Sequence, residues 1–171
     1  MWLAPLSYKI YGKAIYPYGS WYGYFTKEEI ETVMKYGKVD IIAGWHFFPD
    51  EIVYPFREAI NRLYDAKSKA AKGTYQYSLY KIVMNSLYGA FYEKTLHEDG
   101  KYHVGSFFNP VYASLITANT RLKLWKEAMK YKEKVVGLAT DGILIMGDVD
   151  IPYTKELGCF SVKERGDTVI L

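Results

Sequence analysis

The chain has 171 residues, half of them hydrophobic, which suits one globular unit or two small subdomains that share a core. No apolar run reaches the ~20 residues of a membrane helix, and residues 1–6 are too short for an anchor or a signal sequence. The composition therefore predicts a soluble, cytoplasmic protein without a membrane partner. A net charge of +3 does not by itself indicate a nucleic-acid-binding protein.

Cysteine and histidine contribute little to the functional prediction. The single cysteine, Cys159, excludes an internal disulfide and gives no zinc pattern. The three histidines lack the spacing of a metal site, so we interpret them as incidental: His46, His97 and His103.

The N-terminal third predicts strands, one helix and a further strand. Residues 1–23 are rich in Tyr, Gly and Pro, which indicates short strands and turns. Thr26 and Glu29 have the spacing of a capping box, so a helix should begin there and end at Gly37. The apolar run from Val39 to Phe48 predicts a strand.

Two consecutive helices should follow, from Glu51 to Lys72 and from Thr74 to Gly89, because the apolar spacing is helical and Gly73 interrupts it. Such helices most simply form an antiparallel hairpin. The first helix carries a local excess of basic residues: Arg57, Arg62, Lys67, Lys69 and Lys72. These could cluster with Lys81 of the second helix, or they could form an ordinary solvated face.

The second helix would have one polar and one apolar face. At about 100° per residue, Lys81, Asn85 and Tyr88 lie within roughly 60° of one another. A lysine can meet a phosphate, and a tyrosine ring can pack on a sugar or a base. The alternative is an ordinary amphipathic helix whose polar side is solvated. The opposite face should be buried: Leu79, Ile82, Val83 and Leu87.

The next segments predict a β-hairpin and a long helix. Asp99 and Gly100 lie between two aromatic, alternating segments, which is a hairpin signal. The helix should run from about Val111 to Lys132 and place Thr117 and Arg121 one turn apart. That pair could contact a phosphate backbone, although the residues alone favour a local pair on a surface helix.

The C-terminal third predicts strands. Val135–Leu138 and Ile143–Met146 should form a buried hairpin with Asp141 at its tip, where the carboxylate could bind magnesium. The alternative is that Asp-Gly is turn chemistry alone. Two more strands are expected at 159–163 and 168–171. The apolar end of the chain indicates truncation or a missing partner.

Four motifs resemble those of the family B DNA polymerases, and they occur in the family order. Lys81–Gly89 matches every specified position of the K-x-x-x-N-S-x-Y-G motif of the fingers. Ile116–Arg121 is similar to the helix segment that follows it, particularly in the protein-primed viral branch. Ala139–Gly142 lies where the family has D-T-D-S, and Leu157–Phe160 resembles the stretch beyond it.

The resemblance implies an α+β fold in which an antiparallel helix hairpin, the fingers, joins an antiparallel β-sheet palm with a packed helix. The expected parts are a palm-proximal strand, helix and strand region at 1–48, the fingers hairpin at 49–89, and a palm with the metal-binding hairpin at 90–171, truncated before the thumb. The acid motif D-x-x-S-L-Y-P is absent from the chain and by order should lie just before Met1. The link between Gly89 and Asn109 has no room for the large insertion of phage protein-primed enzymes.

The resemblance also implies roles for single residues. Lys81 would contact the triphosphate of the incoming nucleotide, Asn85 would help to hold it, and Tyr88 would pack against the sugar and the nascent base pair. Asp141 would be a catalytic carboxylate of the two-magnesium site. Further cations toward the triphosphate would come from Arg62, Lys67 or Lys69, with no choice among them. The implied DNA contacts are Gly89, Thr117, Arg121 and Thr140.

The implied function is that of a DNA-directed DNA polymerase of viral or plasmid origin, acting in the host cytoplasm. Ala139 replaces the first acid of D-T-D-S, so the two-magnesium site is incomplete and the chain should not polymerise alone. The implied partners are primer-template DNA, deoxynucleoside triphosphates and, as one option, a second polypeptide with the exonuclease domain and the missing acid. The alternative is a non-catalytic remnant that binds DNA or a replication partner.

Overall fold

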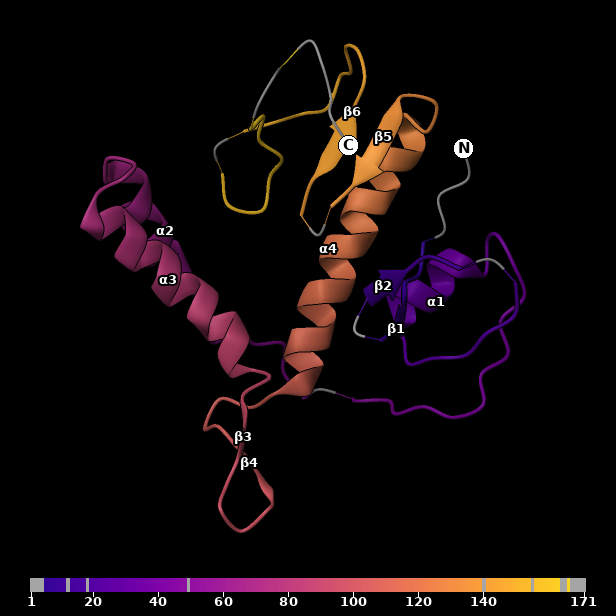
Figure 1. The fold of residues 1–171 in the computed structure, drawn as a ribbon, viewed down its shortest axis with the longest axis horizontal. Helices are drawn as coiled ribbons and strands as arrows, with labels where there is room; N and C mark the ends of the chain where they lie inside the picture. The colour runs from indigo at the N-terminus through magenta and orange to yellow at the C-terminus, as the bar shows by residue number, and fades with distance from the viewer. Residues whose placement is uncertain are drawn as a thin grey trace. The chain divides into compact units, whose positions relative to one another are not determined.

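The computed structural model describes residues 5–11, 13–17, 19–48, 50–139, 141–154, 156–163 and 166. The fold is mixed α+β, as expected (Figure 1). In chain order, the described elements are β1 (Tyr8–Ile10), β2 (Lys13–Ile15), α1 (Lys27–Val33), α2 (Arg57–Lys69), α3 (Tyr75–Ala90), β3 (Lys94–Leu96), β4 (Tyr102–Val104), α4 (Pro110–Lys130), β5 (Val135–Leu138) and β6 (Ile143–Ile145).

The chain divides into two compact units. The first unit comprises Met1–Val53 and Asn85–Gly147, and the second comprises Tyr54–Met84 and Asp148–Leu171. The division falls within α3, so the helix begins in the second unit and ends in the first. The assignment of fingers and palm to parts of this fold stays a prediction. None of the described helices is both long and apolar enough to cross a membrane.

The core of the first unit forms around α4. The bounds of this helix, Pro110–Lys130, are close to the predicted range of 111–132. Pro110 is a favourable first residue, and the Asn109 side chain accepts a hydrogen bond from the Tyr112 amide at 3.1 Å. The Trp125 ring is buried and packs edge-on against Tyr36, with ring centroids 5.4 Å apart. The other buried apolar residues of α4 are Ala113, Ala118, Leu122, Leu124 and Ala128.

The capping box of α1 is confirmed. The Thr26 hydroxyl accepts a hydrogen bond from the Glu29 amide at 3.4 Å, and the Glu29 carboxylate accepts one from the Thr26 amide at 3.0 Å. Because both donors lie at the free end of the helix, these bonds satisfy amides that have no partner within the helix. The helix ends at Val33, four residues before the predicted stop at Gly37, whose amide donates to the Val33 carbonyl.

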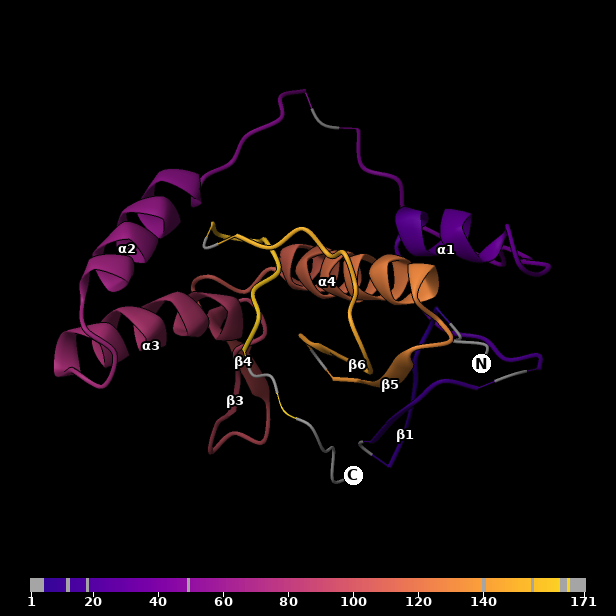
Figure 2. The same cartoon turned by 90° about the horizontal axis from the view of Figure 1, so that it is seen from above.

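Three antiparallel hairpins account for the described sheets. The pairs are β1 with β2, β3 with β4 and β5 with β6, so the strands form three separate two-stranded sheets. The described strands are thus antiparallel, as expected, and the assignment of a palm sheet to them stays a prediction. The hairpins at Asp99-Gly100 and Ala139–Gly142 are confirmed. The β5–β6 hairpin lies beside the C-terminal half of α4 (Figures 1 and 2).

The helix pair in the second unit forms around a turn at Gly73. This residue has φ = +87°, a conformation that costs glycine little and an L residue more. Figure 2 shows α2 and α3 leading into and out of this turn. The first helix begins at Arg57 and not at Glu51, because Pro55 disfavours helical geometry at Tyr54. No residue of α2 or α3 is buried, so the expected burial of Leu79, Ile82, Val83 and Leu87 is wrong.

Two predicted strands are also wrong. The described residues of 39–48 form no strand, and Ile42, Trp45 and Phe48 are at least 80% exposed. A strand needs a hydrogen-bonding partner, and apolar composition does not supply one. Residues 159–163 contain only an isolated bridge between Tyr153 and Phe160. The strand predicted at 168–171 lies outside the described residues.

Candidate nucleic-acid interface

A hollow of about 670 Å³ lies within the first unit. It joins residues from the segment before α1, from α1 itself, from the end of α3 and from α4. Its aromatic lining residues are Tyr24, Phe25, Tyr88 and Tyr92. Its other lining residues are the hydroxyl-bearing Ser7, Thr26, Ser114 and Thr117, and the charged Glu29 and Arg121. The hollow thus brings together three residues that the sequence predicted: Tyr88, Thr117 and Arg121.

Two of the residues that line the hollow, Glu29 and Arg121, form an ion pair. The Arg121 Nη2 donates to Glu29 Oε1 at 2.5 Å, across 92 positions of the sequence. The Glu29 side chain is only 2% exposed, whereas the Arg121 side chain is 33% exposed. A buried carboxylate is costly unless it is paired and hydrogen-bonded. Arg121 and the two Thr26 donors supply those partners, so this pair connects α4 to α1.

Tyr88 lines the hollow and is partly exposed. Burial raises the pKa of the Tyr88 phenol, as does neighbouring Tyr92, while the Arg121 cation acts in the opposite direction and does not offset them. The Tyr88 and Tyr92 rings meet edge-on with centroids 6.5 Å apart. The Tyr88 phenol therefore stays neutral at physiological pH and can donate a hydrogen bond.

Thr117 lines the hollow, but its hydroxyl is already engaged. The Thr117 Oγ1 donates to the carbonyls of Ala113 at 2.9 Å and of Ser114 at 3.0 Å. A hydroxyl has one proton, so contact with a phosphate oxygen requires Thr117 to give up this bond. Ser114 lies within 3.3 Å of the Tyr92 hydroxyl.

The other specified residues of the Lys81–Gly89 motif are exposed along α3: Lys81, Asn85, Ser86 and Gly89. Lys81, Asn85 and Tyr88 lie on one continuous helix, as predicted, so they share a face. Gly89 is also exposed, and a Cβ there would meet no other atom within 4 Å. A side chain at this position would therefore cost no packing, and the glycine leaves the surface beside Tyr88 open.

The candidate triphosphate cations of α2 have local partners. Arg62 pairs with Glu58 on the same helix. The Lys67 ammonium lies 4.3 Å from the centre of the Tyr64 ring. Lys69 is exposed in the last turn. Their predicted roles toward a nucleotide stay predictions.

Of the two acids of the family's D-T-D-S motif, this chain has only the second, Asp141. Asp141 is exposed in the turn between β5 and β6, and Thr140 beside it lies outside the described residues. Ala139 occupies the place of the family's first acid. Among the described residues, no three His, Cys, Asp or Glu side chains are close enough to hold an ion together. The residues that the structure describes therefore do not fit a two-magnesium site by themselves.

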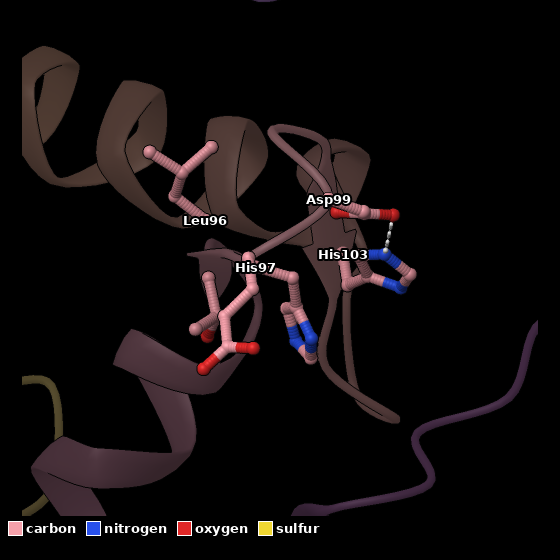
Figure 3. Close-up of a pocket in the computed structure, with 6 residues that line it drawn as sticks. Leu96, His97, Asp99 and His103 are labelled. Carbon is pink, nitrogen blue, oxygen red and sulfur yellow. Dashed lines mark hydrogen bonds and ion pairs between the residues drawn. The ribbon is translucent and has the colours of Figure 1, made fainter.

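A second hollow lies on the β3–β4 hairpin (Figure 3). His103 Nε2 lies 3.3 Å from an Asp99 carboxylate oxygen, and the His97 and His103 rings lie 4.1 Å apart between centroids. Figure 3 shows the two imidazoles beside each other near the loop that joins β3 to β4. These histidines were interpreted as incidental, and their geometry here is that of a hairpin stabilised by local contacts.

Sequence reasoning missed several lining residues. Ser114 precedes Thr117 by three positions, so the two share a face of α4. Tyr92 follows Tyr88 by four positions, a spacing that continues the face of α3 on which Tyr88 lies. Helical spacing from the predicted residues could have found them. Glu29 was predicted only as a cap, because no local pattern indicates a partner 92 residues away.

Comparison with known proteins identifies the family. The family described as "DNA polymerase type B, organellar and viral" matches residues 3–102, which are 100 of the 171 residues. The chain belongs to this family. The matched range includes Lys81–Gly89. It also includes all the lining residues of the hollow that precede α4 in the sequence. The resemblance inferred from the motifs is thereby confirmed.

Two fungal proteins are similar to this polymerase-family chain. A "Probable DNA polymerase" from Neurospora intermedia is 36% identical over 80 residues, which cover 46% of this chain and 8% of that protein. A "Probable DNA polymerase" from Ascobolus immersus is 26% identical over 185 residues, covering 85% of this chain and 15% of that protein. The chain thus spans a small part of the length of either relative. No solved structure matches it.

Proposed function

We infer that this chain binds primer-template DNA and an incoming deoxynucleoside triphosphate as part of a DNA-directed DNA polymerase. Family membership supports the class of reaction. The observation that carries the site is the hollow of the first unit. It gathers Tyr88 of the Lys81–Gly89 motif and Thr117 and Arg121 of the downstream helix, residues to which the resemblance gives roles toward nucleotide and DNA.

The proposed nucleotide contacts lie along α3. Lys81 meets the triphosphate as a flexible point charge, and Asn85, one turn later, donates from its amide. Tyr88, a further turn along, packs its ring on the sugar and the nascent base pair. The motif orders charge, amide and ring along one helix face, which matches the order of triphosphate, sugar and base in a nucleotide.

In this proposal, nucleotidyl transfer needs magnesium ions and at least one carboxylate in addition to Asp141. Magnesium ions supply charge neutralisation for the triphosphate and lower the pKa of the attacking hydroxyl. Asp141 offers one carboxylate toward them, and Ala139 offers none. We therefore assign binding and orientation of substrates to this chain, and we assign no metal-dependent step to it alone.

A triphosphate-binding measurement tests the proposal. A fluorescent deoxynucleoside triphosphate is titrated with magnesium against the chain, against Lys81→Ala and against Lys126→Ala, a control on the exposed side of α4. Loss of one charge-assisted contact should weaken affinity about 10- to 100-fold in Lys81→Ala, because such a contact contributes about 1.5–3 kcal/mol. Lys126→Ala should bind as the unaltered chain does. Equal affinity for all three proteins would contradict the assignment of Lys81.

A second candidate function is a non-catalytic remnant that binds DNA or a replication partner. Ala139 in place of an acid favours it. This candidate predicts strongly salt-dependent DNA binding without selective affinity for a triphosphate. The same titration, repeated with inorganic triphosphate and with a deoxynucleoside, separates the two functions, because only a polymerase site should prefer the complete nucleotide.

A further inference from the structure

The Glu29–Arg121 ion pair connects α1 to α4 in the lining of the hollow. The Glu29 carboxylate is 2% exposed, so it needs its counter-charge within the protein. Arg121 Nη2 supplies that charge at 2.5 Å. The Arg121 Nε is also buried and has no hydrogen-bond partner among the described residues, so this edge of the guanidinium faces the protein interior. The positive charge of Arg121 is thus committed to Glu29.

The other described residues that line the hollow include no lysine or arginine. Apart from this pair, the described lining residues are aromatic or hydroxyl-bearing. Tyr24 is 93% exposed and Tyr92 is 46% exposed, so both residues leave surface on which a base or a sugar can pack. The raised pKa of the Tyr88 phenol shows that its surroundings disfavour a negative charge there, although Arg121 is near.

We propose that Glu29 is a positioning residue that neutralises Arg121 and holds its guanidinium between α1 and α4. The hollow then contacts the uncharged sugar and base of a bound DNA strand, and not its phosphate. The resemblance alone implied the opposite, a backbone contact by Arg121. This inference rests on the proposed function, because it specifies how DNA meets a surface that is proposed to bind it.

The salt dependence of DNA binding tests the inference. A fluorescent primer-template duplex is titrated with the chain at several NaCl concentrations, and the slope of log affinity against log salt is measured. Each phosphate contact by a cation contributes about 0.9 to that slope. The double variant Glu29→Gln/Arg121→Gln should keep the slope of the unaltered chain. Glu29→Gln alone should steepen it by up to about one, because Arg121 then presents an uncompensated charge.

The opposite pattern would overturn the inference. A slope that falls by about one in Glu29→Gln/Arg121→Gln, with no change in Glu29→Gln, means that Arg121 contacts a phosphate in the unaltered chain. The apolar pair Glu29→Leu/Arg121→Met makes the same comparison if the glutamine pair does not fold, since well-packed apolar residues can replace a buried ion pair. Thermal unfolding verifies that each variant is folded.

A matched control is available on the same helix. Lys27 and Glu31 form an exposed ion pair at 3.7 Å on α1, outside the hollow. Lys27→Gln/Glu31→Gln should leave the slope unchanged, and a changed slope would mean that loss of any pair on α1 alters binding and would overturn the specific role of Glu29. No salt-dependent binding by the unaltered chain would instead overturn the proposed function itself.

Discussion

Glu29 has two structural roles at the start of α1. Its Oε2 accepts from the amide and the hydroxyl of Thr26, which completes the capping box, and its Oε1 accepts from Arg121. A carboxylate near a helix N-terminus is also favoured by the helix dipole. One side chain therefore begins α1 and connects it to α4, and this explains how so short a helix contributes a residue that is almost fully buried.

Tyr88 makes a pH-dependent contribution to stability. Burial, together with Tyr92, raises its pKa above the ordinary value of 10.0 in the folded chain. At a pH between the ordinary pKa and the raised pKa, Tyr88 has lost its phenolic proton in the unfolded chain and has kept it in the folded chain. The folded state then binds more protons, so the free energy of unfolding falls as pH rises through this window. Below pH ~9 the effect is absent.

Urea unfolding of the unaltered chain and of Tyr88→Phe, at pH ~8 and pH ~10.5, measures this contribution. The unaltered chain should lose more stability between the two pH values than Tyr88→Phe does, because the other tyrosines titrate in both proteins. Tyr11→Phe, which removes a hydroxyl from a ring that is 99% exposed, is the control. The same loss in Tyr88→Phe as in the unaltered chain would show that Tyr88 contributes nothing to the pH dependence.

The predictable parts of the candidate site are those with local signals. Thr26 and Glu29 are three residues apart, and Lys81, Asn85 and Tyr88 repeat at helical spacing, so both sets could be inferred from the sequence. The pairing of Glu29 with Arg121 and the lining role of Tyr24 depend on how distant segments pack. Packing of this kind leaves no periodic pattern in one sequence, and the structure was needed to find it.

At the scale of elements, α4 is the helix on which the first unit packs. Most of the buried apolar side chains of the described residues belong to it. They include two consecutive large residues, Leu124 and Trp125, so its buried face is wider than a simple stripe. The helix also carries Ser114, Thr117 and Arg121 into the hollow, which means that one element both forms the core and positions the candidate site.

Replacement of Trp125 should therefore destabilise the whole first unit. Trp125 is 5% exposed and packs against Tyr36, and removal of a buried aromatic side chain costs about 3–5 kcal/mol. Trp45→Ala is a matched control, because that ring is 80% exposed, and it should change stability by less than about 0.5 kcal/mol. Urea unfolding followed by circular dichroism measures both. A Trp125→Ala chain as stable as Trp45→Ala would contradict the packing of α4.

Elements with start and stop signals were predictable, and those that depend on a partner were not. The Asp-Gly hairpins and the α4 helix after Asn109 carry their own turn or cap chemistry. The start of α2 was misplaced because Pro55 acts on the residue before it. Residues 39–48 have the composition of a strand, yet no other described strand pairs with them. Composition alone does not determine pairing.

At the scale of the whole molecule, the two units differ in what they bury. The described core residues all belong to the first unit, whereas α2 and the part of α3 in the second unit have no buried residue. The stability of the first unit therefore comes from apolar packing around α4. The second unit exposes a basic helix, α2, and the clustering of its cations with Lys81 stays a prediction.

The final prediction concerns polymerisation by the chain. One carboxylate cannot hold the two metal ions of the family's reaction, so the chain alone should give no primer extension with magnesium. Addition of a second polypeptide that carries the D-x-x-S-L-Y-P segment should allow extension. In that mixture Asp141→Ala should lower the rate at least about 100-fold, since a metal ligand is lost, while Asp50→Ala, a change at an exposed position, should not. Measurement of extended primer on a denaturing gel distinguishes these results. Robust extension by the isolated chain would contradict its dependence on an acid from elsewhere, and an unaffected Asp141→Ala mixture would contradict the assignment of that residue to the metal site.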